Sequence, residues 1–254
     1  MRKSRYAMSA MSFLLAAAMN TARADESGGS PFSVTLETEL RSGYAWRGMV
    51  VSDEGVVQPA LVLANGGFRM GVWGNMNLTD DKTGDAPDFS ELDIKLSYNK
   101  IIGEVEFGLG FTELTYPNRR VSATREVWAS LALPNLVVVP ALAVNYDFNE
   151  AEGMYSTVSA TYVHKLHGDV TLSTIASLAY ATEEYNLCYF GVEEGAFNDL
   201  TAGANLEYEL AYNIKIAGML QYSILLDGDV RDGARARYDA THPASAGIKL
   251  SFTF

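Results

Sequence analysis

The sequence predicts an all-β protein, a closed antiparallel up-and-down transmembrane β-barrel of about 12 strands. Apolar and polar side chains alternate along most of the chain, which is the period of strands with two unlike faces. Short and long connections alternate between successive strands, and no apolar run reaches the ~20 residues that a membrane-spanning helix needs. A closed barrel is the sheet that leaves no backbone group unpaired in lipid.

Residues 1–24 have the order of a secretory signal peptide. Basic residues lie within the first five positions, an apolar run follows, and the segment ends in Ala-Arg-Ala, a small-x-small cleavage pattern. We therefore expect residues 25–254 to form the outer-membrane barrel. Removing residues 1–24 takes away four positive charges and no negative ones, so the net charge falls from −12 to −16. This acidic chain lacks the clustered Lys and Arg of nucleic-acid binding, and we expect no nucleic-acid partner.

Each expected strand shows the period of two between turn signals. In the first strand, Leu36 and Leu40 alternate with Glu37 and Glu39. The pattern predicts strands at the following positions: 32–48, 56–64, 68–79, 88–98, 102–114, 123–133, 136–148, 154–166, 169–181, 197–211, 214–226 and 241–254.

The connections between these strands fall into two classes. Those after even-numbered strands are short, such as Asn65-Gly66-Gly67, and have the composition of tight hairpins. Those after odd-numbered strands are longer and polar, with the longest at 182–196 and 227–238. Outer-membrane barrels have this asymmetry, with short periplasmic turns and longer outer loops. A secreted β-sandwich would also alternate, but it has no reason to sort its loops by length.

The first strand places aromatic and basic residues on opposite faces. Tyr44 and Trp46 share one face, and Arg41 and Arg47 share the other. In an outer-membrane barrel the apolar face contacts lipid, so we expect Tyr44 and Trp46 in the aromatic belt at the outer interface. Arg41 and Arg47 then point into the lumen. A register shift of one residue would move Glu37, Glu39 and Arg41 into lipid, where Arg at the bilayer midplane costs ~2–4 kcal/mol and Glu somewhat less, so the register is well determined.

The same segment carries a family resemblance. SGYAWRGMVVSDEGVVQPAL (42–61) resembles the N-terminal signature of the TorF-like porins, a family of short Gram-negative outer-membrane β-barrels. The matching residues are Tyr44, Trp46, Arg47, Gly48, Ser52 and Gln58, and GVWGNMNLTD (71–80) is similar to that family's next segment. Pro59 and the 182–196 connection depart from its pattern. The resemblance implies an outer-membrane barrel with a porin role.

Charged residues on the inward parity are the candidate pore-lining residues: Glu39, Arg41, Arg47, Glu91, Asp93, Lys95, Glu104, Glu106 and Glu126. A slightly acidic lumen of this kind favours cations or small cationic solutes. The alternative is that these charges form cross-strand ion pairs that brace a narrow barrel, since a lumen of about eight strands is filled by side chains. Trp73, Trp128 and Met219 also point inward and would narrow the lumen.

No residue pattern indicates an enzyme, a cofactor or a metal site. His242 and Ser245 lie three apart and would face opposite sides of a strand, which separates a nucleophile from its base. In DGDVRDG (227–233), Arg231 stands where a calcium loop has its third ligand, so we interpret this segment as a solvated acidic loop. Cys188, the single cysteine, has no disulfide partner within the chain.

The sequence therefore predicts passive diffusion of small polar solutes or ions across the outer membrane of a Gram-negative bacterium. The expected partners are outer-membrane lipid and, during biogenesis, the barrel assembly machinery, whose recognition signal the terminal Phe254 resembles. Two alternatives stay open. One is a closed barrel whose loops bind a surface partner or organise the envelope, and the other is a lipid-modifying enzyme at the barrel rim.

Overall fold

A computed structural model describes residues 32–79, 87–119, 121–238 and 244–254 of the chain. The expected signal peptide, residues 1–24, lies outside the described residues. None of the described helices is long and apolar enough to cross a membrane.

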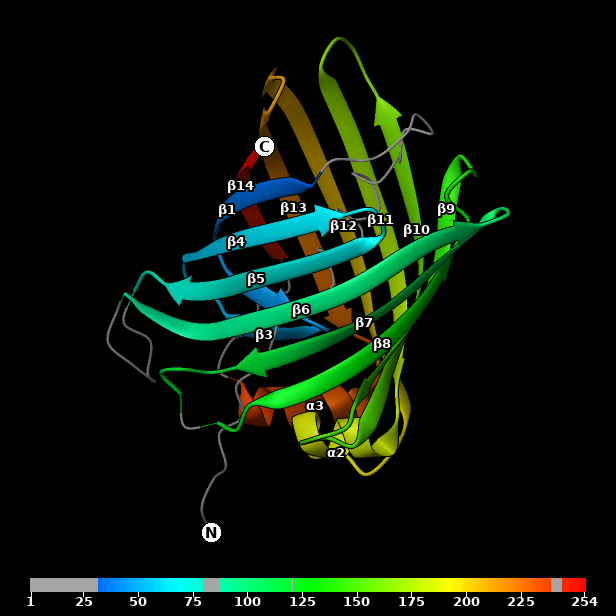
Figure 1. Ribbon diagram of the computed structural model, residues 1–254. Helices are drawn as coiled ribbons and strands as arrows, with labels where there is room; N and C mark the ends of the chain where they lie inside the picture. Colours follow the sequence, from blue (N-terminus) through cyan, green and yellow to red (C-terminus); the bar gives the residue numbers. More distant parts are fainter. Residues whose placement is uncertain (1–31, 80–86, 120, 239–243) are drawn as a thin grey trace.

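Twelve antiparallel strands form a closed barrel, as the sequence predicts (Figure 1). Each strand pairs with its neighbours in chain order, and β1 closes the ring by pairing with both β14 and β4. The barrel strands are β1 (Ser33–Arg41), β4 (Val56–Asn65), β5 (Phe68–Asn77), β6 (Asp88–Ile102), β7 (Val105–Thr115), β8 (Thr124–Ala132), β9 (Val138–Asp147), β10 (Gly153–Lys165), β11 (Val170–Ala181), β12 (Ala196–Ala211), β13 (Ile214–Leu225) and β14 (Ala244–Thr253).

Alternation gives the strands an apolar outer face and a polar inner face. On β1, Leu36 and Leu40 are exposed on the outside, whereas Glu37 and Glu39 turn inward. The register with β14 continues this pattern, since Glu39 lies opposite Lys249. A slip of one residue would carry these charges to the apolar face, so the alternation fixes the register.

The two ends of the barrel differ in their connections. Short turns join β4 to β5, β6 to β7, β8 to β9, β10 to β11 and β12 to β13 at the end that we call the short-turn end. The opposite, long-loop end carries additional structure: a hairpin of β2 (Tyr44–Trp46) and β3 (Met49–Ser52), and the helices α2 (Glu183–Phe190) and α3 (Gly228–Arg237). Figure 1 shows both helices together at this end.

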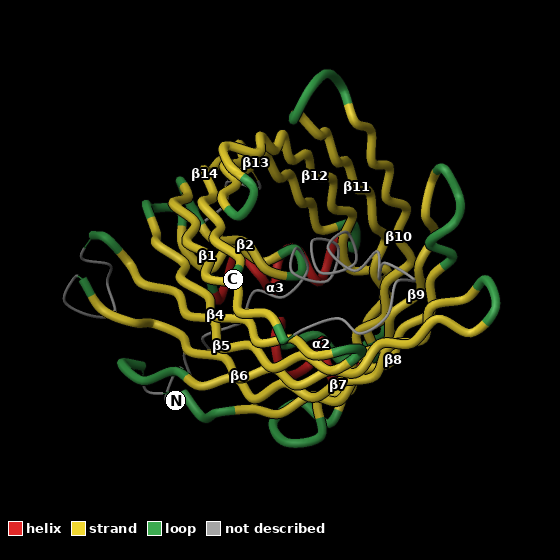
Figure 2. The backbone as a smooth tube through the Cα atoms, turned by 45° about the horizontal axis from the view of Figure 1, so that its top comes forward, coloured by secondary structure: helices red, strands yellow, loops and turns green. Residues whose placement is uncertain are grey.

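The predicted first strand, 32–48, is wrong in its second half. β1 ends at Arg41, and the following residues form the β2–β3 hairpin, whose strands pair only with each other. Figure 2, which looks into the barrel, shows β2 inside the ring of strands. Gly43 permits the bend, because a Cβ at this position would lie 2.9 Å from the Ser52 carbonyl oxygen.

The predicted loop at 227–233 is the start of a helix instead. Asp227 caps α3 by accepting hydrogen bonds from the backbone nitrogens of Asp229 and Val230 at 2.9 and 3.0 Å. Arg235 and Arg237 lie in the last turn, where positive charge complements the helix dipole. This segment therefore has the charge pattern of a capped helix.

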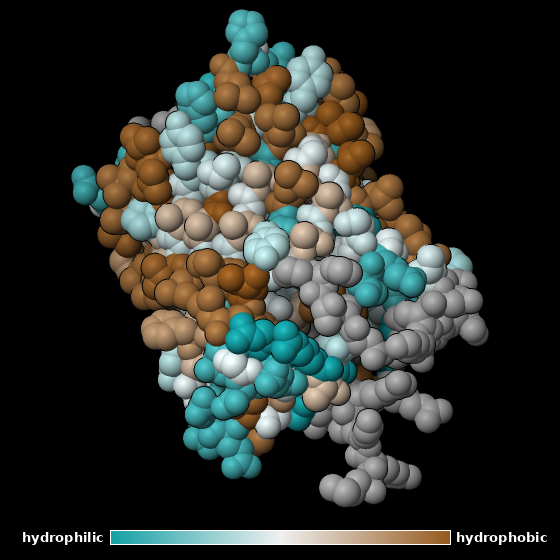
Figure 3. Space-filling model, turned by 180° about the vertical axis from the view of Figure 1, so that it is seen from behind, coloured by the Kyte–Doolittle hydropathy of each residue, from teal (hydrophilic) through white to brown (hydrophobic). Residues whose placement is uncertain are grey.

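The outer surface separates apolar and polar regions. Figure 3 shows hydrophobic side chains over the strands and hydrophilic side chains gathered at the lower end, where Figure 1 shows α2 and α3. Exposed aromatic residues occur at both ends, with Tyr146 and Phe148 near the long-loop end and Tyr98 and Tyr208 near the short-turn end. This distribution matches an apolar band between two aromatic belts.

Candidate functional site: the plugged lumen

The β2–β3 hairpin turns at Arg47 and Gly48. Both residues have positive φ, 46° and 79°, as in the two-residue hairpin turns that usually contain Asn-Gly or Gly-Gly. Gly48 adopts this backbone freely and packs closely, since a Cβ there would lie 2.5 Å from the Leu225 side chain. Arg47 adopts it at a cost of about 1–3 kcal/mol. The contacts of the Arg47 side chain must offset this strain.

Arg47 reaches across the lumen to β8. Its Nη1 and Nη2 atoms donate hydrogen bonds of 2.7 Å to Oε1 and Oε2 of Glu126. The side chains of Arg47 and Glu126 are only 3% and 1% exposed. Two parallel charge-assisted bonds fix both distance and orientation, so the hairpin tip is fastened to the opposite wall.

Three aromatic rings surround the Arg47 guanidinium. Its central carbon lies 4.4 Å from the Trp46 ring centroid, 4.5 Å from that of Tyr155 and 5.6 Å from that of Tyr185. The Tyr185 hydroxyl also accepts a hydrogen bond from Nη1 at 3.2 Å. These are cation–π distances. We call the group formed by Trp46, Glu126, Tyr155 and Tyr185 the guanidinium cage.

Tyr44, which was expected in the lipid-facing belt, points inward instead, and Tyr155 of β10 also points inward. The Tyr44 hydroxyl donates to Glu91 of β6 at 3.0 Å, and its ring lies 5.8 Å from that of Trp73. The Tyr155 hydroxyl donates to Asp199 of β12 at 2.5 Å. Burying a tyrosine gains a large apolar contact when its hydroxyl finds a partner, and carboxylates of the wall supply that partner here.

Trp46 is also buried inside the barrel, contrary to the belt prediction. Its ring meets the ring of Tyr189 from α2 edge-on, with centroids 5.6 Å apart. The Tyr189 hydroxyl donates to Asp147 of β9 at 3.1 Å. The helix can approach β10 because a Cβ at Gly153 would lie 2.4 Å from the backbone nitrogen of Tyr185. Helix α2 therefore fills the space between the hairpin and the wall.

Helix α3 holds the end of α2 in place. Arg237 donates to the Cys188 carbonyl oxygen at 2.6 Å, and the Tyr238 hydroxyl donates to the Tyr189 carbonyl oxygen at 2.8 Å. These contacts satisfy carbonyls at the helix end that lack a partner within the helix. Close packing requires Gly233, where a Cβ would lie 2.3 Å from the Phe190 carbonyl oxygen.

The hairpin and both helices share one hydrophobic cluster with the wall. We call the part of it contributed by β2, β3, α2 and α3 the plug. Its buried residues are Tyr44, Trp46, Met49, Tyr185, Tyr189, Phe190, Val230 and Ala234. The plug fills the lumen at the long-loop end.

Outside the plug, the inward charges form local ion pairs. Arg41 donates to Glu39 at 3.2 Å, to Gln221 at 3.1 Å and to Ser245 at 2.8 Å. Among the described residues, the wall also carries the pairs Lys249–Glu37 at 3.8 Å and Lys215–Glu207 at 2.8 Å, and Lys95 pairs at 3.5 Å with Asp93, which is enclosed at the plugged end. This agrees in part with the bracing alternative, because neighbouring charges on the wall neutralise each other.

The wall formed by β10 and β11 has a different character. Cross-strand pairs such as Ser159–Ser177 and Thr157–Ala179 carry small uncharged side chains between outward residues such as Val158. Several of these inward side chains are only half-buried. One side of the lumen therefore carries charged side chains, and the side formed by β10 and β11 carries small side chains, many of them with hydroxyl groups.

The predicted lumen residues are distributed between these regions. Glu39, Arg41, Lys95 and Glu106 lie on the wall. Arg47, Glu91, Asp93 and Glu126 are enclosed at the plugged end. Glu104 is not a lumen residue: β6 continues to Ile102, and Glu104 lies in the exposed turn that begins at Gly103, whose φ is 64°. In the sequence, Gly103 was the residue that could have indicated a turn at Glu104.

Trp128 lies flat along the wall. A Cβ at Gly110 of β7 would lie 2.3 Å from the indole ring of Trp128, and one at Gly108 would lie 3.2 Å from it. The two glycines create a shallow seat for the ring. Trp128 therefore takes up less of the lumen than its size suggests.

The described residues give little support to the rim-enzyme alternative. The Ser245 hydroxyl accepts a hydrogen bond from Arg41 inside the barrel. His242 lies outside the described residues.

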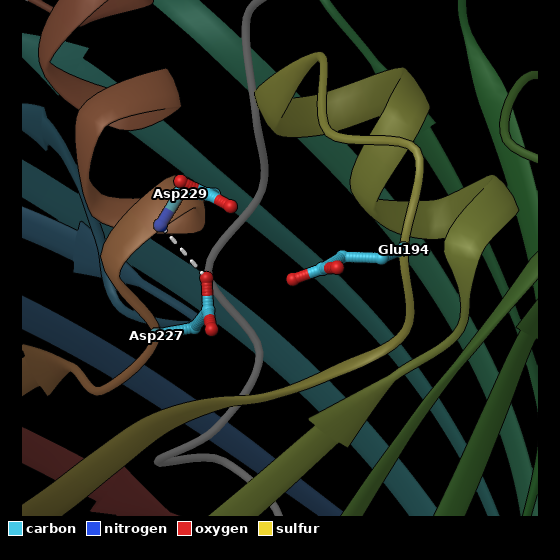
Figure 4. A group of neighbouring side chains, drawn as sticks. All are labelled: Glu194, Asp227 and Asp229. Atoms are coloured by element: carbon cyan, nitrogen blue, oxygen red, sulfur yellow. Dashed lines mark hydrogen bonds between the residues drawn. The ribbon is translucent and has the colours of Figure 1, made fainter.

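A separate carboxylate group lies at the long-loop end (Figure 4). The carboxylate oxygens of Glu194, Asp227 and Asp229 lie within 4.8 Å of one another. Glu194 and Asp229 are exposed, and Asp227 caps α3. Exposed acidic groups of this kind also occur without a metal ion, so we assign this group no metal.

The described part of the long-loop end is acidic. Its carboxylates are Asp53, Glu54, Glu150, Glu152, Glu183, Glu184, Glu193, Glu194, Asp227, Asp229 and Asp232, and its arginines outside the lumen are Arg119, Arg231, Arg235 and Arg237. An entrance with an excess of one charge concentrates ions of the opposite charge.

A closed antiparallel barrel with an apolar exterior and a polar lumen has the architecture of the class of membrane-spanning β-barrels. Within this class, the chain belongs to the Gcw_chp family, which is described as a bacterial protein of unknown function and whose model matches residues 25–222. No curated protein matches the chain by sequence.

Solved structures show the same fold. The NanC porin is 13% identical with a TM-score of 0.53, and the match covers 86% of this chain and 98% of NanC. The KdgM porin, which has also been solved in complex with disordered oligogalacturonate, is 13% identical with a TM-score of 0.51 over 87% of this chain and 99% of KdgM. An outer-membrane channel from Pseudomonas putida F1 is 8% identical with a TM-score of 0.51 over 91% and 99%.

Proposed function

We propose that this protein is an outer-membrane channel that allows passive diffusion of small polar solutes or ions, and that the plug controls access to it. The observation that carries the proposal is the polar inner face. Charged and hydroxyl side chains continue around the wall beyond the region that the plug fills. The fold shared with porins and the TorF-like signature around Arg47 support the same function.

The orientation follows from the two ends of the barrel. Outer-membrane barrels place their short turns in the periplasm and their longer loops outside. We therefore propose that α2, α3 and the acidic loops face the exterior, and that the apolar band contacts outer-membrane lipid. The exposed Phe254, next to the end of β14, is then available to the barrel assembly machinery.

The preference for cations over anions, measured as ion selectivity, tests the proposed pore directly. In a variant whose hairpin is shortened to a tight turn, replacing residues 43–54, Glu106→Gln should reduce the cation preference measured by reversal potential in a planar bilayer. Glu106 is a buried residue of β7 on the inward face. Glu104→Gln is the matched control, because its carboxylate lies in the exposed turn two residues away. Equal reversal potentials for both variants would contradict a conduction path along this wall.

A closed barrel with a structural or surface-binding role is the second candidate. The plug is the observation that favours it, since its aromatic residues are excluded from solvent. A barrel that its plug keeps closed predicts no openings of the wild-type protein, whereas a channel predicts brief or rare ones, and this difference separates the two functions.

A further inference from the structure

We propose that the guanidinium cage is a binding site for the guanidinium or amine group of a cationic solute, and that Arg47 occupies this site while the plug is in place. A role of this site in transport rests on the proposed channel function. Binding of the cation to the site does not rest on it. The neighbouring geometry explains both the choice of cation and the unusual position of Arg47.

The cage matches a guanidinium in shape and in charge. Glu126 accepts two hydrogen bonds of 2.7 Å from the planar fork of Arg47. Tyr155 presents its ring face at 4.5 Å, and the Tyr185 hydroxyl accepts a third bond at 3.2 Å. Aromatic faces around a single carboxylate are a general arrangement for recognising organic cations.

Most of the cage is independent of the hairpin that fills it. Glu126 belongs to β8, Tyr155 to β10 and Tyr185 to α2, whereas Trp46 alone comes from the hairpin. If the hairpin leaves, the carboxylate and two of the rings stay on the wall and on α2. A free cation would then find the contacts that Arg47 now makes.

The backbone preference of the hairpin turn does not explain why an arginine stands at position 47, whereas filling the cage does. A two-residue turn with two positive φ angles is best served by Asn-Gly. Arg47 adopts φ of 46° in spite of its side chain, and Gly48 alone meets the preference. The arginine stands at a strained position from which its guanidinium fills the cage.

The surrounding charge also favours a cation. Further wall carboxylates line the plugged end, where Glu91, Asp147 and Asp199 each accept a hydrogen bond from a tyrosine hydroxyl. The described outer loops carry more carboxylates than arginines. A cationic solute would be drawn to this end and would replace the charge of Arg47 without leaving Glu126 unpaired.

Chemical rescue tests the site. Full-length mature Arg47→Ala protein is refolded in detergent micelles and titrated with methylguanidinium at constant ionic strength. We expect a saturable rise in Tm of at least about 2–4 °C. Arg125→Ala is the matched control, because it removes an arginine from an exposed pair with Glu113 on the barrel, and its Tm should not respond.

The double variant Arg47→Ala, Glu126→Gln should lose the response, because it removes the carboxylate that would hold the ligand. If Arg47→Ala folds only when methylguanidinium is present, the rescue of folding is itself the expected result. If Arg47→Ala folds neither with nor without methylguanidinium, the Arg47→Lys variant is used in its place. The lysine keeps the positive charge but lacks the planar fork of the guanidinium. Methylguanidinium should again raise the Tm of this variant.

A Tm response equal to that of Arg125→Ala, or one that survives Glu126→Gln, would overturn the proposed site. The measurement needs no conductance. A specific Tm response in a protein that forms no pore would keep the cation site and reject the channel function, whereas conductance without the Tm response would do the reverse.

Discussion

Arg47, at the tip of the β2–β3 hairpin, is bound to Glu126 of β8 by two hydrogen bonds of 2.7 Å. The two residues are 79 positions apart in the chain and both are buried. The bond joins a segment that enters the lumen to the wall that surrounds it. It therefore fastens the tip of the hairpin to the wall of the barrel.

Loss of Arg47 should destabilise the protein strongly. Arg47→Ala leaves the Glu126 carboxylate buried without its cation, which costs about 3–5 kcal/mol in comparable buried pairs. The free energy of unfolding, measured by urea titration in micelles, should fall by that amount.

Two comparisons isolate the origin of this loss. Adding Glu126→Gln to Arg47→Ala removes the stranded charge and should recover part of the stability. Arg125→Ala, which breaks an exposed pair with Glu113, should cost less than about 1 kcal/mol. A loss for Arg47→Ala no larger than that for Arg125→Ala would show that the buried pair does not hold the hairpin.

Gly153 should be essential for seating α2. A Cβ at this position would lie 2.4 Å from the Tyr185 backbone, so Gly153→Val should displace the helix and loosen the plug. We expect faster proteolysis between β11 and β12 and a lower Tm. Gly218→Val is the control, since a Cβ at Gly218 meets no atom within 4 Å. Equal proteolysis of the two variants would argue against tight packing of α2 on β10.

The sequence predicted the barrel but not the plug, for a physical reason. Strand period depends on the local alternation of side chains, and this pattern located the barrel strands and the difference between the two ends. Tyr44, Ala45 and Trp46 have the same alternation whether the chain continues along the wall or bends into the lumen. The bend depends on distant partners such as Glu91 and Glu126, which no local pattern contains.

Weaker local signals of the plug were present. Gly43 precedes the inward hairpin, Gly48 lies in its turn, and Asp227 stands at the start of α3 as a helix cap. Helix α2 has no comparable apolar stripe, and its position depends on the space above Gly153. Its burial is set by tertiary packing, so the sequence indicated a loop there.

Gly110 should control the width of the lumen at Trp128. A Cβ at Gly110 would lie 2.3 Å from the indole ring, so Gly110→Leu should push the ring away from the wall and into the lumen. In the hairpin-shortened variant, this change should lower single-channel conductance. Gly71→Leu is the control, because a Cβ at that inward position meets its neighbours at 3.8 Å or more. A larger reduction with Gly71→Leu would contradict the seat assigned to Trp128.

The Cys188 thiol should be slow to react near neutral pH. Burial, followed by the nearby carboxylates of Asp147 and Glu150, raises the pKa of this thiol from 9.0 to about 11. The thiolate is the reactive form, so alkylation in the folded protein should accelerate about tenfold per pH unit up to that pKa. Mass spectrometry after timed labelling measures the rate. A plateau near pH 9, as expected for the urea-unfolded protein, would contradict the burial of Cys188 on α2.

Surface labelling tests the orientation of the barrel. In a Cys188→Ser background, Asp232→Cys places a thiol on the exposed side of α3, and Glu104→Cys places one in the short turn between β6 and β7. A membrane-impermeant maleimide should label Asp232→Cys on intact cells and Glu104→Cys only after the outer membrane is permeabilised. The reverse pattern would place the plug in the periplasm.

The most direct test of a plugged channel compares the single-channel conductance of the wild-type protein with that of the variant in which residues 43–54 are replaced by a tight turn. Both proteins are refolded, checked for β-content and inserted into planar bilayers. Removing Trp46 and Arg47 from the lumen should turn brief or rare openings into discrete, long-lived steps that prefer cations. A correctly folded and inserted variant that stays silent would contradict the account, because removal of the hairpin would then not open the barrel.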